Sequence, residues 1–497
     1  MSGQYEGLVA SLSFSGEAKL SIGEAGLVAD SLFEQLVIPY EAIERFALED
    51  YQVGIFRSAR RGAMEEINVS RLGNACQWFY DELRAAYNSR VLEAFLVTDA
   101  AEFETRGGYS IEEAQPQKQR ASGGDKVNSA ASGREGPLAE LKVFPSCFCL
   151  LPPGKDGRRI PFAFINGLKE EDFALAVTLS TGEAYHFRKL GYDLAPFKKT
   201  IEDHIRALRE KNAKFVAALC ESLGDSLGLS ESTRGGQLMP EGMAVPMERL
   251  NAQLPVLAAA VEKKIANSKM SDTYGSLKEL CRREDIAVGI KELPPEKVEE
   301  LKAALIEKLS AEQESQGAGG GEADTEITLT PEQEDALRWR IWAVAPSKDG
   351  RHAVAEFAFP DEDTATYIFR VAGEWQEFLP LFNRGMEATD FGREILSMPE
   401  EELAKEQHAL YQMALDRTPA LQNLRQQFRG RVIHRSAESW KKGVRQYLAS
   451  NSSNAAGEND RSGTEKDRAA PRQAFCTQCG ARLETSMKFC GQCGTQV

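Results

Sequence analysis

The first hundred residues carry short runs in which apolar and polar positions alternate, or in which β-branched and aromatic residues gather. Turn signals separate these runs, so we predict strands at residues 18–22, 26–29, 36–40, 51–56 and 67–71. Residues 74–95 change to helical spacing, with apolar side chains at Trp78, Phe79, Leu83, Tyr87 and Leu92. An antiparallel sheet needs such a helix to cover its apolar face. The pattern therefore predicts a small sheet-plus-helix domain over residues 1–100.

Much of this pattern occurs twice. Ile38-Pro39-Tyr40 returns as Ile160-Pro161-Phe162, and Glu49-Asp50-Tyr51 returns as Glu171-Asp172-Phe173, both at an offset of 122 residues. Leu72-Gly73 matches Leu190-Gly191 after a small gap. At the offset of 122, the helices that follow share Asp81 with Asp203, Leu83 with Ile205, Arg84 with Arg206 and Ala85 with Ala207. A recurring offset predicts a second, related domain, at residues 138–222.

The order of elements in both copies, strands first and a closing helix last, resembles pleckstrin-homology-like (PH-like) or GRAM-like domains. The resemblance covers about residues 5–95 and 138–212 and rests on element order. It would allow a lipid-headgroup role, for which Arg57, Arg60 and Arg61 of the first copy are the candidates. The second copy lacks that basic cluster.

A third, abbreviated copy is predicted within residues 331–450. The run from Tyr367 to Gly373 echoes that from Tyr185 to Gly191, and the Asp349-Gly350 turn echoes Asp156-Gly157. Helices are expected to dominate residues 375–448. Residues 223–315 are expected to be mainly helical, with helices at 247–266 and 295–314 and a loop-like start.

Three polar, Gly- or Ser-rich segments separate these regions. Residues 115–137 and 316–330 are predicted to be linkers, the first of them disordered. Residues 451–474 form a third, flexible linker ahead of residues 475–497.

The C-terminal segment carries two pairs of cysteines, Cys476 with Cys479 and Cys490 with Cys493, each followed by a glycine. Four thiolates close a tetrahedral site, so the pattern predicts one structural Zn²⁺ per chain. Redox chemistry is the competing interpretation, but a redox C-x-x-C normally opens a helix in a βαβ unit, and no such unit is predicted here. The overall fold class is therefore α+β: tandem small antiparallel sheet-plus-helix (PH-like) domains, helical segments and a C-terminal zinc ribbon.

The F-C-x-x-C-G form, at residues 475–480 and again at 489–494, resembles the short zinc-ribbon modules appended to many bacterial and archaeal proteins. The resemblance covers the C-terminal segment alone. It implies zinc binding together with assembly or regulatory contacts, and it does not fix an activity.

Composition and charge limit the kinds of partner and the cellular compartment that we expect for this protein. Apolar residues make up 42% and charged residues 27% of the chain, as in ordinary globular proteins. A net charge of −15 disfavours broad binding to nucleic acid or anionic membranes. Five further cysteines are scattered, which beside a thiolate metal site indicates a reducing compartment. No signal peptide and no apolar stretch long enough to span a membrane is visible, so we expect a cytoplasmic protein.

Two other patterns have weaker functional interpretations. Gly224-Asp225-Ser226-Leu227-Gly228 matches a nucleophile elbow, and Asp349 with His352 could complete a hydrolase triad. The match fails on context, because a helix rather than a strand leads into Ser226. The segment 425–447 could bind nucleic acid, because basic residues are interleaved there with Trp440 and Tyr447. The basic candidates are Arg429, Arg431, Arg435, Lys441, Lys442 and Arg445. A solvated helix face with core aromatics is the favoured explanation.

We therefore expect a non-enzymatic adaptor or regulatory protein that binds zinc and contacts protein partners. The alternative is a nucleic-acid-associated factor that uses the basic segment 425–447 and the zinc ribbon.

Overall fold

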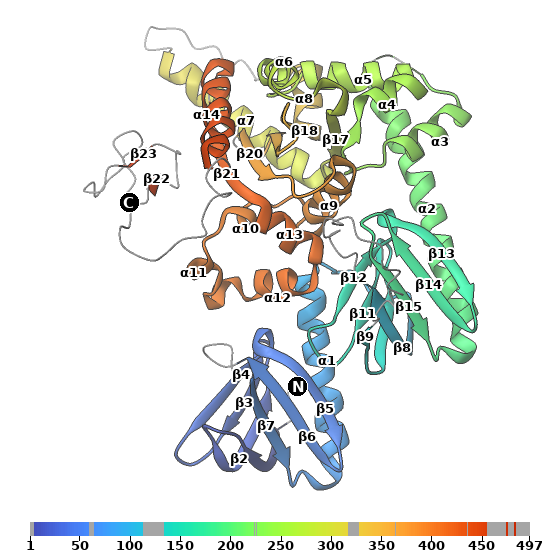
Figure 1. Cartoon of the computed structure of the whole chain (residues 1–497), viewed down its shortest axis with the longest axis vertical. Coiled ribbons are helices and arrows are strands. Elements are labelled where there is room, and N and C mark those ends of the chain that lie inside the picture. Colours follow the sequence, from blue (N-terminus) through green and yellow to red (C-terminus); the bar gives the residue numbers. More distant parts are fainter. Residues whose placement is uncertain are drawn as a thin grey trace, which may run out of the picture. The chain divides into compact units, whose positions relative to one another are not determined.

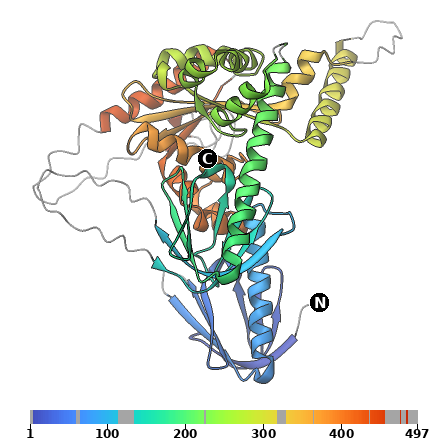
Figure 2. The same ribbon diagram turned by 90° about the vertical axis from the view of Figure 1, so that its right-hand side faces the viewer.

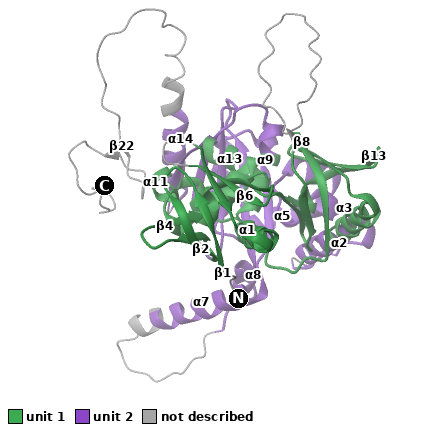
Figure 3. Cartoon of the chain, turned by 90° about the horizontal axis from the view of Figure 1, so that it is seen from below, with its two compact units in different colours: residues 1–208, 380–426 green, residues 209–379, 427–497 purple. Residues whose placement is uncertain are grey.

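The computed structural model describes residues 4–58, 64–112, 134–222, 224, 226–316, 328–362, 364–434, 436–454, 474–475 and 482–483. Contacts divide the chain into two compact units (Figure 3). Unit 1 comprises Met1–Leu208 and Pro380–Gln426, and unit 2 comprises Arg209–Leu379 and Gln427–Val497. Mixed helices and antiparallel sheets make the fold α+β, as predicted.

Unit 1 begins with a seven-stranded antiparallel sheet of order β4-β3-β2-β1-β7-β6-β5, closed by helix α1 (Figures 1 and 2). Alternation places Ala18, Leu20 and Ile22 of β2 in the core and leaves Lys19 exposed. The elements are β1 (Gln4–Ala10), β2 (Ser15–Ile22), β3 (Gly26–Asp30), β4 (Gln35–Pro39), β5 (Ile43–Glu49), β6 (Gln52–Ser58), β7 (Met64–Ser70) and α1 (Cys76–Ala94). The sequence pattern missed β1 and β5, in which charged residues interrupt the apolar runs.

Helix α1 buries Phe79, Leu83, Tyr87 and Val91 at regular helical spacing against this sheet. Trp78 was expected on the same face, but it lies a residue away from the stripe and is 70% exposed. The expectation for Trp78 was therefore wrong.

The second sheet of unit 1 has the order β12-β11-β10-β8-β15-β14-β13, with β9 paired to β8 (Figure 1). Its elements are β8 (Phe103–Glu112), β9 (Arg134–Glu135), β10 (Ala139–Val143), β11 (Cys147–Leu151), β12 (Arg158–Pro161), β13 (Ile165–Glu171), β14 (Ala174–Leu179) and β15 (Ala184–Arg188), followed by helix α2 (Leu194–Glu221). Because β8 pairs with β10 and β15, this domain starts before residue 138. Of the segment expected to be a disordered linker, residues 115–137, the part 115–133 lies outside the described residues. Since β8 precedes this segment and belongs to the second sheet, the segment does not separate the two domains.

The repeat is confirmed by backbone conformation. Strands β5 and β13 begin at Ile43 and Ile165 and end at Glu49 and Glu171, and two-residue turns with positive φ follow in both copies. The helices, however, align one turn away from the match made on sequence. Phe79 and Leu83 occupy the buried positions that Phe197 and Ile201 occupy in α2. A shift of one turn returns a helix to nearly the same face, which explains why the match on Asp81 and Asp203 misled.

The remaining part of unit 1 is a set of short helices: α10 (Glu394–Ser397), α11 (Glu400–Leu403), α12 (Ala409–Arg417) and α13 (Pro419–Gln427). Helix α12 packs on α1, with Met413 inside the core of the first repeat. The fully buried Arg417 donates from Nη2 to the Tyr87 hydroxyl at 2.6 Å and from Nη1 to the Met413 carbonyl at 3.0 Å.

Unit 2 is built on a six-stranded antiparallel meander of order β16-β17-β18-β19-β20-β21 (Figure 1). Its strands are β16 (Val245–Pro246), β17 (Ala287–Glu292), β18 (Trp339–Pro346), β19 (His352–Ala358), β20 (Ala365–Arg370) and β21 (Phe428–Ile433). The helices of unit 2 are α3 (Leu229–Leu238), α4 (Met247–Gln253), α5 (Pro255–Ala266), α6 (Ser271–Leu280), α7 (Pro295–Gln316), α8 (Pro331–Arg338) and α14 (Ala437–Asn454). Helix α9 (Trp375–Ala388) begins in unit 2 and continues into unit 1 from Pro380. Every position of β19 is buried.

This sheet corrects the predicted third copy. The Asp349-Gly350 turn does join β18 to β19, as expected, but the continuous meander differs from the strand order of the two repeats. Two of its strands come from residues 223–315, the region expected to be mainly helical, so residues 331–450 are not a domain of their own. The expected loop-like start of that region contains α3, and the single helix predicted over 247–266 is two helices, α4 and α5.

A buried carboxylate organises the core of unit 2. Glu356 of β19 is 1% exposed and accepts hydrogen bonds from Trp440 Nε1 at 3.0 Å and Thr273 Oγ1 at 3.2 Å. Thr366 donates a further hydrogen bond to it, and His434 Nε2 lies 2.9 Å from its Oε1. The carboxylate thus links β19, β20, α6, α14 and the segment after β21.

Candidate functional site

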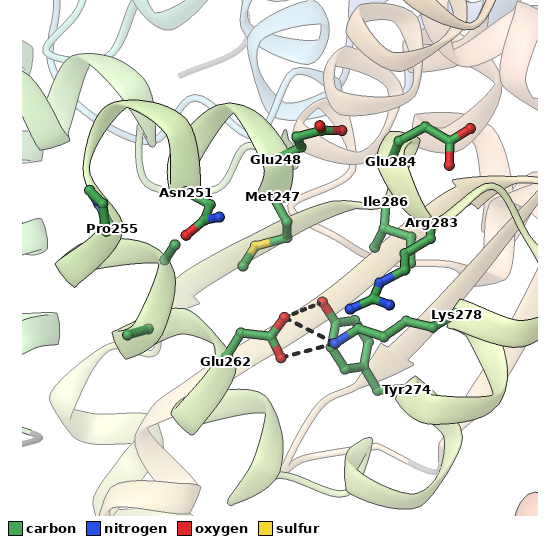
Figure 4. Close-up of a pocket in the computed structure, with 12 residues that line it drawn as sticks. Met247, Glu248, Asn251, Pro255, Glu262, Tyr274, Lys278, Arg283, Glu284 and Ile286 are labelled. Atoms are coloured by element: carbon green, nitrogen blue, oxygen red, sulfur yellow. Dashed lines mark hydrogen bonds and ion pairs between the residues drawn. The ribbon is translucent and has the colours of Figure 1, made fainter.

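Unit 2 contains a pocket of about 500 Å³ between helices α4, α5 and α6 and the short 3-10 helix η5 (Arg283–Asp285) (Figure 4). Its lining residues are Met247, Glu248, Asn251, Pro255, Ala258, Ala259, Glu262, Tyr274, Lys278, Arg283, Glu284 and Ile286. This volume falls in the range of ligand and side-chain binding sites.

Local sequence explains the apolar floor of the pocket. Pro255 has no backbone N–H and cannot continue α4, so it ends that helix and occupies the first turn of α5. The backbone N–H of Met247 donates to the Ile286 carbonyl at 2.9 Å, which brings the start of α4 beside the end of η5. Ala258 and Ala259 present only methyl groups, so space remains above the floor.

One wall of the pocket is a polar network on Glu262. Its carboxylate accepts hydrogen bonds from the Tyr274 hydroxyl at 3.3 Å and from Lys278 Nζ at 3.0 and 3.2 Å (Figure 4). The Lys278 ammonium also lies 4.1 Å from the centroid of the Tyr274 ring. Burial, and after it the Glu262 carboxylate, raises the pKa of Tyr274 well above its ordinary value. Tyr274 therefore stays a hydrogen-bond donor at neutral pH.

Glu248 of α4 and Glu284 of the neighbouring η5 form the rim, whereas the Arg283 side chain extends toward Lys278 and Tyr274 (Figure 4). An apolar floor under a charged rim suits an apolar side chain whose polar backbone remains at the opening. Among the twelve lining residues there is no histidine, cysteine or serine. The arrangement is suited to holding a segment of protein.

The predicted zinc ligands Cys476, Cys479, Cys490 and Cys493 lie outside the described residues. Close to them, β22 (Ala474–Phe475) pairs with β23 (Arg482–Leu483), so two antiparallel strands flank the segment that contains Cys476 and Cys479. Four thiolates in two C-x-x-C pairs are a donor set that Zn²⁺ prefers. Within the part of the chain that the structure describes, no other group of three or more His, Cys, Asp or Glu residues could hold a metal ion.

Three side chains of the segment 425–447 are engaged within the protein. Arg425 belongs to unit 1, where it pairs with Glu400 at 2.8 Å and donates to backbone carbonyls. Trp440 was a candidate for stacking on bases, but its side chain is fully buried. Lys441 pairs with Glu279 at 2.8 Å. The favoured explanation, a helix face with core aromatics, is therefore confirmed for Trp440, and the base-stacking alternative is wrong for this residue.

The remaining candidates from the sequence are those for a hydrolase site and for a lipid-headgroup site. Ser226 lies in a loop between α2 and α3, so no strand leads into it, as expected. His352 is a buried residue of β19 whose backbone N–H donates to Ser347 Oγ at 3.1 Å. Arg57 pairs with Glu65 at 2.7 Å, whereas Arg60 and Arg61 lie outside the described residues. No helix among the described residues has the length and apolar character that a membrane span requires.

Comparisons with known proteins identify one module. The family model of a zinc-ribbon domain matches residues 475–497, which confirms the predicted ribbon and implies zinc binding. No curated protein matches the sequence. Among solved structures, the chain is similar to one from the "Structure of the Spt16D Pob3N heterodimer", at 12% identity over 37% of this chain and 85% of that chain, with a TM-score of 0.15. Such a score carries no argument about the fold, so the resemblance to PH-like domains gains no support from it.

Proposed function

We propose that this protein is a non-enzymatic, cytoplasmic, zinc-binding adaptor that holds a segment of a partner protein in the pocket of α4, α5 and α6. The zinc ribbon at residues 475–497 serves as a second contact. The observation that carries the proposal is the pocket itself, which combines an apolar floor at Met247, Ala258 and Ile286 with a charged rim.

The polar groups of the pocket support binding in preference to catalysis. The Glu262 carboxylate accepts hydrogen bonds from both Tyr274 and Lys278, and these contacts hold it against the wall of the pocket. Five described cysteines, Cys76, Cys147, Cys149, Cys220 and Cys281, are buried and in the thiol form, in keeping with a reducing cytoplasm. Protein is favoured over nucleic acid as the partner because Trp440 is in the core and Arg425 is tied to carbonyls.

Filling the pocket should abolish partner binding. Ala259 is exposed and lines the pocket, so Ala259→Trp places an indole in the space without disturbing the core. In a nuclease-treated pull-down from native lysate, we expect recovery of the bound protein to fall at least about tenfold. The measurement is quantitative mass spectrometry of the captured proteins.

Ala252→Trp is the matched control, since Ala252 is an exposed alanine on α4 that does not line the pocket. Ala252→Trp should recover the same protein as the unmodified chain. Equal recovery by both variants would refute a role for the pocket. Partners that disappear on nuclease treatment of the unmodified chain would favour the nucleic-acid alternative instead.

A further inference from the structure

The two repeats of unit 1 share an unusual hairpin turn. In the first repeat, Asp50 and Tyr51 join β5 to β6 with φ of 46° and 58°. In the second, Asp172 and Phe173 join β13 to β14 with φ of 47° and 59°. Two-residue hairpin turns of this kind favour Asn-Gly or Asp-Gly, because a side chain with a Cβ is disfavoured at positive φ. An aromatic residue stands where glycine would fit best.

At these two turns, burial of the aromatic ring does not offset the unfavourable backbone conformation. Tyr51 is 83% exposed and Phe173 is 90% exposed. The chain uses the same dipeptide conformation after α9, where Asp390 and Phe391 have φ of 45° and 67°, but there Phe391 is 3% exposed. At that site burial of the ring offsets the unfavourable backbone. At the two hairpin tips the exposed ring is available to another molecule.

An exposed aromatic residue in one repeat does not always have an aromatic residue at the equivalent position of the other. Tyr192, in the 3-10 turn before α2, is fully exposed, and the equivalent turn of the first repeat has Asn74. By contrast, the tips keep the string Glu-Asp-aromatic in both copies, as Glu49-Asp50-Tyr51 and Glu171-Asp172-Phe173. The retained features are the ones that a partner would contact.

The charge around the rings indicates what that partner is. Glu49 and Asp50 directly precede Tyr51 in the chain, and both are exposed. Beside Phe173, Lys169 pairs with Glu171 and Lys198 pairs with Glu170 at 3.1 Å, which leaves Asp172 as the carboxylate next to the ring. An aromatic face beside a carboxylate attracts guanidinium and ammonium groups through cation–π contact and charge together. The chain's net charge of −15 adds to this attraction.

We propose that the hairpin tips at Tyr51 and Phe173 are two docking anchors for an arginine- and lysine-rich segment of a partner protein. Each ring receives a cationic side chain on its face, and the neighbouring carboxylates hold the charge. Because the tips belong to unit 1 and the pocket to unit 2, either site can be removed without altering the residues of the other.

The test uses the full chain and a fluorescein-labelled peptide of twelve alternating arginine and lysine residues. Fluorescence anisotropy should give a Kd at least about tenfold weaker for the Tyr51→Gly, Phe173→Gly double variant than for the unmodified chain. Tyr192→Gly, at an exposed aromatic outside the tips, should leave the Kd unchanged. A peptide of alternating glutamate and lysine should bind neither protein.

Thermal unfolding separates binding from folding. The double variant should keep or raise its Tm, since glycine relieves the positive φ and no buried contact is lost. Phe391→Gly should lower the Tm, because that ring is buried. An unchanged Kd in the double variant overturns the proposal. So does an equal loss of affinity with Tyr192→Gly, which would show that exposed aromatic residues outside the tips bind the peptide equally well, or tip-dependent binding of single-stranded DNA or phosphatidylserine vesicles.

Discussion

Replacing Cys476 and Cys479 with serine will lower the bound zinc from about one ion per chain to none. The two thiolates are half of the predicted ligand set, and the remaining pair, Cys490 and Cys493, cannot close a tetrahedral site alone. Structural zinc sites of this type bind with apparent free energies of about 10–16 kcal/mol, so the loss will be complete and not partial. Elemental analysis of the purified protein measures it directly.

The controls for this experiment are substitutions at two single cysteines elsewhere in the chain. Cys76→Ser and Cys281→Ser change buried, free thiols and should leave the zinc content as it is. Chelation of zinc should also leave tryptophan fluorescence unchanged, because residues 455–497 contain no tryptophan. Zinc retained by the Cys476→Ser, Cys479→Ser variant, or a metal-free, disulfide-linked protein, would contradict the assignment.

Replacing Glu356 with alanine should lower the free energy of unfolding of unit 2 by about 3–5 kcal/mol. The change leaves the hydrogen-bond donors Trp440 Nε1 and Thr366 Oγ1 without the acceptor they have in Glu356, inside a core where water cannot replace it. Thr273 Oγ1 loses the same partner and keeps the Met270 carbonyl. It also removes the carboxylate that lies 2.9 Å from His434 Nε2. Few single substitutions reach this magnitude.

Tryptophan fluorescence during denaturant unfolding can follow this loss, because Trp339, Trp342, Trp375 and Trp440 all belong to unit 2. Glu262→Gln is the matched control: its side chain is 44% exposed, so its loss should cost about 1 kcal/mol or less. If the two variants unfold at the same denaturant concentration, the cluster on Glu356 does not hold the core together.

The features of the fold that depend on local sequence could be predicted. Asp349-Gly350 gave the turn between β18 and β19, and Glu49-Asp50-Tyr51 marked the repeat because a turn imposes the same dihedral angles in each copy. The central position of β8 could not be read in this way. The segment 113–133 separates it from its partner β10, and long-range pairing leaves no local signal.

The candidate functional residues show the same difference. Those defined by local spacing could be predicted, and those brought together from separate segments could not. The zinc cysteines follow from spacing, since a knuckle is local in sequence. The pocket is assembled from three helices and a 3-10 turn, and only Pro255 hinted at it by breaking the predicted helix over 247–266. Trp440 was expected to be a core aromatic and is one, because the apolar face of an amphipathic helix packs on the core of its own protein.

Site-specific photo-crosslinking tests the adaptor most directly. A benzophenone amino acid is placed at position 259, inside the pocket, or at position 252, on α4 outside it, and the full chain is irradiated in native lysate. The account predicts a nuclease-resistant protein adduct at 259 that is absent at 252, with the crosslink mapped to one peptide of the partner. Identical adducts at both positions, or nucleic acid as the crosslinked species, would contradict it.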